Sequence, residues 1–251
     1  MSIAENLSRV RERIAAAARM AGRGPHDIAL MAVSKTVETA SIREAYDAGQ
    51  RLFGENRVQE FAEKYGALRD LAGAEWHMIG HLQSNKAAKA AELFGAIDSV
   101  DSLRLAERID AAASKLDRSV DVLIELNLGN EEAKTGIREG SGELNEILLA
   151  GARLQHVRIR GLMAVPPFTE DPEGARPYFR KLRDLRDQIA AQKIPGVSMD
   201  VLSMGMSHDF EVAIEEGSTC VRVGTAIFGA RFKNLTTEDT KEHKDNTGLA
   251  G

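Results

Sequence analysis

Lys35 is the first residue of this sequence whose type and position suggest chemistry. It closes the apolar run IALMAVSK (28–35), so a primary amine follows a segment with the pattern of a buried strand. The carboxyl ends of parallel strands are where α/β barrels build their active sites. An apolar barrel mouth lowers the pKa of a lysine, because burial disfavours the charged ammonium. The neutral amine is then populated and can form a Schiff base with an aldehyde or ketone. A solvated lysine at a strand end is the alternative.

Two loops near the end of the chain have the composition of an anion site. LSMGMSHDF (202–210) passes from an apolar run through a glycine and a serine into a helical pattern, and RVGTAIFG (222–229) does so with Gly224 and Thr225. Backbone N–H groups at such turns, helped by hydroxyls, bind phosphate. An amine for an aldehyde and a cradle for a phosphate together suggest pyridoxal 5′-phosphate, PLP. Ser207 taken alone is also typical of a helix N-cap.

Arg222 shares a strand face with Gly224, because strand side chains alternate. A guanidinium does not readily accept a proton, so an arginine facing a pyridine nitrogen would leave that nitrogen unprotonated and the ring a weaker electron sink. A salt-bridged arginine inside a barrel mouth explains the same position. Cys220 lies one step back on this face, and its apolar neighbours predict a buried thiol.

Eight apolar runs predict the strands that would position these residues. Some, such as VDVLIEL, are almost continuously apolar, as strands buried on both faces are. Helical patterns separate them, which is typical of parallel α/β folds. The predicted strands are Ile28–Ser34, Arg51–Gly54, Glu75–Gly80, Ala96–Val100, Val120–Leu126, Arg158–Ala164, Ser198–Met204 and Cys220–Gly224. The helix-like stretches include Thr39–Gly49, Val58–Leu71, Leu103–Leu116, Gly142–Ala152 and Gly174–Ala191.

Eight such units favour a single (β/α)₈ TIM barrel, which takes about 250 residues; a six-strand open sheet is the alternative. An extra amphipathic helix over 2–21 precedes them, with a capping box at Ser2 and Glu5 and a stop at Gly22 and Gly24. We expect one barrel domain over 1–231. The polar remainder, 232–251, is predicted to be a disordered tail.

Composition excludes several classes of protein. The chain has 251 residues, 43% of them hydrophobic and 28% charged, and a net charge of −5, which does not favour nucleic-acid binding. One cysteine excludes an intramolecular disulfide, and the six histidines lack metal-ligand spacing, so no metal site is predicted. No signal peptide and no run of about 18 apolar residues occur, so we predict a cytoplasmic protein that does not span a membrane.

Seven segments together resemble a known family. In order and spacing they are similar to the pyridoxal phosphate homeostasis proteins called YggS or PROSC, over nearly the whole chain up to Arg231. The segments are AVSKT (32–36), FGENRVQE (53–60), WHMIGHLQSNK (76–86), KTG (134–136), RGLMAV (160–165), LSMGMSHDFEVAI (202–214) and GSTCVRVGTAIFGAR (217–231).

The resemblance implies a barrel like the N-terminal domain of alanine racemase, a role in vitamin B6 and amino-acid homeostasis, and no established catalytic turnover. PLP would be bound covalently to Lys35. His208 stands where some relatives have a small or acidic residue, and an exposed helix-start histidine is the simpler interpretation. Further matched positions are Ser203 or Ser207, Gly224 and Thr225 at the phosphate, Arg222 at the pyridine nitrogen, Asn56 and the HLQSNK loop near the cofactor, and Lys134 in passing it onward.

Two functions remain open besides buffering and delivery of PLP to apoenzymes. One is a small fold-type III PLP enzyme, a racemase or lyase; the other is a Schiff-base aldolase acting on sugar phosphates. Related racemases take a second catalytic residue from another domain, whereas only 20 residues follow Arg231 here. The three tyrosines, at 46, 65 and 178, all fall in helical patterns. We expect a monomer or a weak homodimer.

Overall fold

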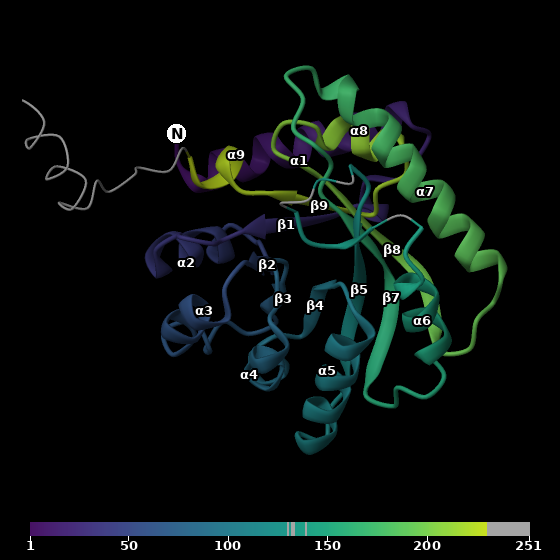
Figure 1. Cartoon of the computed structure of the whole chain (residues 1–251). Helices are drawn as coiled ribbons and strands as arrows, with labels where there is room; N and C mark the ends of the chain where they lie inside the picture. Colours follow the sequence, from purple (N-terminus) through teal and green to yellow (C-terminus); the bar gives the residue numbers. More distant parts are fainter. Residues whose placement is uncertain (130, 132–133, 139, 230–251) are drawn as a thin grey trace, which may run out of the picture.

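The structure, a computed structural model, describes residues 1–129, 131, 134–138 and 140–229; the predicted tail at 232–251 lies outside them (Figure 1). Eight parallel strands close into a barrel, because β1 pairs with both β2 and β9 while β4 pairs with β5. This confirms the TIM barrel and excludes the open sheet. The barrel strands are β1 (Ala29–Val33), β2 (Leu52–Glu55), β3 (Glu75–Met78), β4 (Ala96–Val100), β5 (Val120–Asn127), β7 (Val157–Ala164), β8 (Val197–Met206) and β9 (Cys220–Val223).

Helices surround the barrel, as the alternation of patterns predicts (Figure 1). The stretch predicted as one helix over 58–71 ends earlier, at Tyr65, and a two-residue strand β6 (Ile137–Arg138) is additional. The helices are α1 (Ile3–Met20), α2 (Thr39–Asp47), α3 (Val58–Tyr65), α4 (Ala87–Leu93), α5 (Leu103–Lys115), α6 (Glu143–Ala150), α7 (Arg176–Ala191), α8 (Phe210–Glu215) and α9 (Thr225–Phe228). Short 3₁₀ turns are η1 (Pro25–Asp27), η2 (Ser84–Lys86) and η3 (Pro172–Ala175).

The main hydrophobic core lies between the barrel and the helices. Phe61 of α3 packs against Trp76 of β3 and against Phe94, with ring centroids 4.8 Å apart in both pairs. Trp76 also stacks on Phe53 of β2. Since strand side chains alternate, the neighbour His77 faces the inside of the barrel. The inside of the barrel is therefore partly polar, whereas the core between the strands and the helices is apolar.

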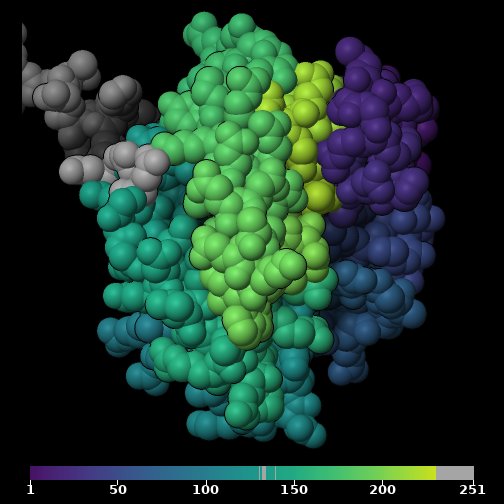
Figure 2. Space-filling model, turned by 90° about the vertical axis from the view of Figure 1, so that its right-hand side faces the viewer, coloured from purple at the N-terminus to yellow at the C-terminus, as the bar shows by residue number. Residues whose placement is uncertain are grey.

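Helix α1 joins the two ends of the described chain. The predicted capping box is present, because the Ser2 hydroxyl accepts the Glu5 N–H and the Glu5 carboxylate accepts the Ser2 N–H. Asn6 Nδ2 donates to the Ile227 carbonyl at 2.9 Å, and Arg13 pairs with Glu211 at 2.6 Å. Figure 2 shows this purple helix directly beside the yellow C-terminal residues. Helix α1 therefore packs against α8 and α9, the last helices of the barrel, next to the point where β9 pairs with β1.

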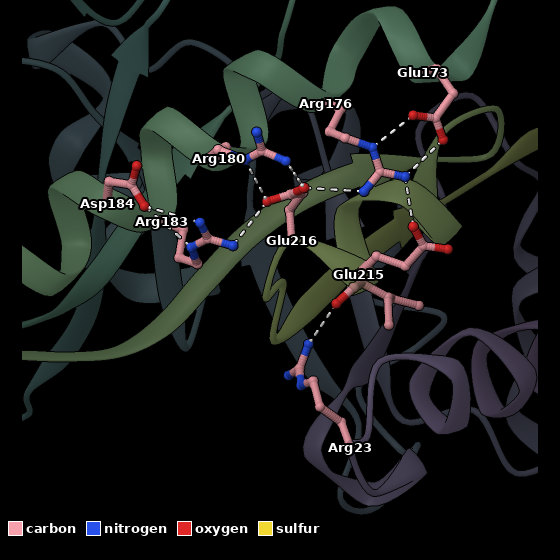
Figure 3. A network of polar contacts seen from close by, with 9 residues as sticks. Arg23, Glu173, Arg176, Arg180, Arg183, Asp184, Glu215 and Glu216 are labelled. Carbon is pink, nitrogen blue, oxygen red and sulfur yellow. Dashed lines mark hydrogen bonds and ion pairs between the residues drawn. The ribbon is translucent and has the colours of Figure 1, made fainter.

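A group of ion pairs fastens α7 to α8 (Figure 3). Glu216, at the end of α8, is only 5% exposed and accepts hydrogen bonds from Arg176, Arg180 and Arg183 at 3.1, 2.9 and 2.8 Å. These arginines lie four and three residues apart, so they share one face of α7. We call these four residues the Glu216 cluster. It holds the far end of the helix that follows the predicted phosphate loop.

No helix within the described part of the chain has the length and apolar character needed to cross a membrane.

Candidate functional site

A cavity of about 370 Å³ opens at the carboxyl ends of the strands. It brings together Lys35, Asn56, Lys134 and Arg222, four of the predicted residues, from distant parts of the chain. A larger cavity, of about 680 Å³ between β6 and α7, contains none of them. The remaining lining residues of the smaller cavity are Val33, Ile79, Gly80, His81, Glu125, Leu126, Thr135, Val165 and Met206.

Lys35 is half-buried and lies two residues after the end of β1. The next residue, Thr36, has a φ of +60°. This left-handed conformation is unusual for a β-branched side chain, and it persists where surrounding contacts enforce it. The backbone N–H of Thr36 donates to the Glu60 carboxylate at 2.6 Å. The chain thus turns sharply at the lysine and is held there from α3.

Asn56 follows β2 and carries a buried oxygen, Oδ1, without a hydrogen-bond partner. Gly80, after β3, presses against the Asn56 backbone, and a Cβ at position 80 would lie 2.4 Å from the Asn56 carbonyl oxygen. The close approach therefore requires glycine. An unsatisfied acceptor beside a cavity is the feature that a ligand with a hydrogen-bond donor satisfies.

Arg222 of β9 is buried, and its guanidinium donates to the Ser203 hydroxyl at 2.6 Å and to the Ala164 carbonyl at 2.9 Å. Burial lowers the pKa of Arg222, and the carboxyl groups of Asp98 and Glu125 oppose that shift. An arginine remains a cation under such conditions. Among the described residues a hydroxyl and a carbonyl hold this guanidinium, so it is not the salt-bridged arginine of the alternative interpretation.

A second hydrogen bond, between a side chain and the loop backbone, joins the two predicted anion-binding loops. The Gly224 N–H donates to Ser207 Oγ at 3.3 Å, and Thr225 beside it is exposed. Ser207 is not the cap of α8, since the N-cap position belongs to Asp209. The Asp209 carboxylate accepts the Met206 N–H at 2.6 Å, and burial raises the pKa of Asp209. Sequence analysis missed Asp209, which looks like an ordinary helix-start residue.

Ser203 and Ser207 occupy different surroundings. The Ser203 hydroxyl is fully buried beneath Arg222, whereas Ser207 is half-buried in the loop next to the cavity. His208 is exposed: its Nε2 lies 3.0 Å from the Glu170 carbonyl oxygen, and its ring packs against Phe168. Of the two serines, Ser207 is therefore the more accessible.

Glu125 and Thr135 also line the cavity, and sequence analysis missed both. The Thr135 hydroxyl donates to the Glu125 carboxylate at 3.2 Å, and burial raises the pKa of Glu125. An acid inside the apolar run VDVLIEL was the available signal. Gly136, with a φ of +99°, lets this segment approach β5, because a Cβ there would lie 2.9 Å from the Asn127 nitrogen.

Lys134 reaches the cavity from the same segment. Its ammonium pairs with Glu131 at 2.7 Å and donates to the Pro166 carbonyl at 3.1 Å. The two-residue strand β6, which follows it, pairs with the end of β5 and fixes the segment at the barrel mouth. The structure thus places the second predicted amine in the same cavity as Lys35.

Below the cavity, His77 Nδ1 lies 3.1 Å from the Asp98 carboxylate. Burial lowers the pKa of His77, but the Asp98 charge and hydrogen bond outweigh it, so the pKa is raised. Burial and the neighbouring Asp98 raise the pKa of the Cys220 thiol to about 12, as expected for an inert buried thiol. Over the described ranges, no three His, Cys, Asp or Glu residues converge to hold a metal ion.

Known proteins resemble this chain in sequence and in fold. The family model for the alanine racemase N-terminal domain matches residues 6–232. The pyridoxal phosphate homeostasis protein of Aquifex aeolicus is 51% identical over 232 residues, which cover 92% of this chain and 99% of that protein.

Solved structures extend the comparison to the fold. PipY of Synechococcus elongatus, in a structure with PLP bound, is 41% identical, covers 91% of this chain and 100% of its own, and superposes with a TM-score of 0.79. Alanine racemase from Streptomyces coelicolor, at 19% identity and a TM-score of 0.69, covers 92% of this chain and 59% of its own and shares the fold alone. The chain therefore belongs to the family of pyridoxal phosphate homeostasis proteins, YggS or PROSC, which is built on the alanine racemase N-terminal barrel.

Proposed function

We propose that this protein binds PLP through a covalent bond between the Lys35 amine and the aldehyde carbon of the cofactor. The observation that carries the proposal is the convergence of that amine, the Arg222 guanidinium and the unpartnered Asn56 Oδ1 in one cavity. The loop pair joined at Ser207 and Gly224 lies beside it and suits a phosphate. These residues fit the charges and the donors of PLP.

Each residue would have a separate task. PLP when bound supplies an electrophilic carbon and an electron-accepting ring. Arg222, fixed by Ser203, would face the pyridine nitrogen and leave it unprotonated. Ser207, Gly224 and Thr225 would hold the phosphate. Ser203 would therefore support Arg222 rather than contact the phosphate.

The proposed role is to buffer PLP and deliver it to apoenzymes that depend on it, in vitamin B6 and amino-acid homeostasis in the cytoplasm. An enzyme needs a second acid or base across the cofactor. All three tyrosines lie in helices and none lines the cavity: Tyr46 in α2, Tyr65 in α3 and Tyr178 in α7. The side chains that line the cavity and can exchange a proton are His81, Glu125 and Lys134, and the turnover assay below tests whether any of them acts as that group. Lys134, an amine in the same cavity, is proposed to take part in passing the cofactor onward.

The test is an absorbance spectrum of the purified protein, with mass spectrometry of the lysine peptide after borohydride reduction. We expect a yellow protein with its reduced adduct on Lys35, no adduct there in Lys35→Ala, and an unchanged spectrum in the control Lys89→Ala, a surface lysine of α4. A colourless protein that takes up no added PLP would refute cofactor binding. Racemisation or elimination of an amino acid above background, lost in Lys35→Ala, would refute the carrier role in favour of a small enzyme.

A further inference from the structure

We propose that Glu60 and Lys64 of α3 act as positioning residues that fix the direction of the Lys35 side chain and thereby the affinity for PLP. The proposal rests on the assignment of Lys35 to the cofactor. Neither residue lines the cavity, so both would act through the backbone on either side of the lysine. We call this ion pair the α3 clamp.

The α3 clamp holds the residue before Lys35 and the residue after it. Lys64 Nζ donates to the Ser34 carbonyl at 3.1 Å and pairs with the Glu60 carboxylate at 2.5 Å. The same Glu60 oxygen accepts the Thr36 N–H at 2.6 Å. One ion pair, with its members four residues apart on a single helix face, thus grips both neighbours of the lysine.

One of the two residues that the α3 clamp holds, Thr36, has a strained backbone. Thr36 has a φ of +60°, a conformation that glycine adopts freely and that a β-branched residue keeps only under external constraint. The hydrogen bond from Thr36 to Glu60 supplies such a constraint. If it were lost, Thr36 would relax toward ordinary backbone angles. Lys35, the preceding residue, would then point elsewhere.

The α3 clamp is sheltered from water and has a third charged partner, so its geometry is better fixed than that of an exposed ion pair. The Lys64 side chain is 14% exposed. A third group, the fully buried carboxylate of Glu55 at the end of β2, lies 3.5 Å from Lys64 and accepts the Ser34 hydroxyl at 2.7 Å. Pairs sheltered from water are screened less than exposed ones. Lys64 therefore ties the ends of both β1 and β2 to α3.

The first experiment measures the PLP affinity of the apoprotein by absorbance titration for Glu60→Ala and for Glu63→Ala, a control at an exposed glutamate on the same helix. We expect Glu60→Ala to weaken binding about tenfold, about 1.4 kcal/mol, and Glu63→Ala to leave it unchanged. Glu60→Gln keeps an acceptor for Thr36 but loses the charge, so we expect an intermediate loss. Equal affinity of wild type and both Glu60 variants would overturn the proposal.

A second experiment separates positioning of the lysine from general support of the fold. Thr36→Gly removes the strain, so in that background Glu60→Ala should weaken binding by less than about threefold instead of about tenfold. A purely structural role predicts the same loss in both backgrounds, and that result would overturn the proposal. Failure of wild type itself to bind PLP at Lys35 would refute the proposed function instead, which keeps the two failures distinct.

Discussion

Replacing Glu216 with glutamine tests the electrostatics that fasten α8 to α7. The carboxylate, 5% exposed, accepts four charge-assisted hydrogen bonds of 2.8–3.3 Å from three arginines. Removing one member of a buried pair costs about 3–5 kcal/mol. That figure must be reduced here, because Arg176, Arg180 and Arg183 are 25%, 55% and 32% exposed and water can solvate them. Arg176 also keeps its pairs with Glu173 and Glu215. We therefore expect a loss of about 2–3 kcal/mol in the free energy of unfolding.

Urea and thermal unfolding at pH 7 measure this loss. For a chain of this size, 2–3 kcal/mol corresponds to a fall in Tm of about 4–12 °C. Glu211→Gln, which removes the more exposed pair with Arg13 on the same helix, is the control and should cost less than about 1 kcal/mol. A Glu216→Gln protein within about 0.5 kcal/mol of wild type would refute the reasoning.

The pH dependence supplies an independent check on the same variant. The arginines lower the pKa of Glu216 against the opposing effect of burial. A carboxyl whose pKa is lower in the folded state contributes stability that is present above its unfolded pKa, about 4.3, and is lost as the pH falls through the folded value. The difference between wild type and Glu216→Gln should therefore shrink in acid. A difference that stays constant down to about pH 3 would contradict the assignment of the loss to the charge.

Two further predictions concern the barrel itself. The raised pKa of His77 beside Asp98 implies that their pair stabilises the fold fully below about pH 6.5 and that this contribution is lost as the pH rises through the folded pKa. Urea unfolding of wild type and His77→Gln from pH 6 upward should show a shrinking difference; a constant one would contradict the pair. A Cβ at position 161 would lie 1.8 Å from the Val201 carbonyl oxygen, so Gly161→Ala must push β7 and β8 apart. We expect it to lose about 3 kcal/mol in the same assay, and a loss below about 1 kcal/mol would show that the strands adjust without cost.

The strand count could be predicted because each barrel strand coincides with an apolar run bounded by polar or glycine-containing turns. A strand end also indicated Lys35, since the carboxyl edge of a parallel barrel collects such residues, and the alternation of strand side chains placed Arg222 on the face of Gly224. Strand β6 could not be predicted in this way. Two residues carry no periodicity, and their pairing with β5 depends on the close approach at Gly136.

Contacts between different helices and strands could not be predicted either, because a local sequence pattern does not show which elements meet. Ser203 and Ser207 look equivalent in LSMGMS, yet one is buried under Arg222 and the other lies in the loop against Gly224. The α3 clamp depends on which turn of α3 faces the end of β1. The sequence shows Glu60 only as part of an ordinary helical segment.

The contact between α1 and the C-terminal helices has a consequence for synthesis on the ribosome. Residues 3–20 are made about 200 residues before their partners in α8 and α9, such as Glu211 and Ile227. At about 5–20 residues per second, the apolar face of α1 stays without its native cover for about 10–40 s. Leu7, Val10 and Ile14 are then open to chaperones, and the ring of strands cannot close until translation reaches β9. A nascent chain stalled before residue 210 should therefore be sensitive to proteases over the part that has left the ribosome.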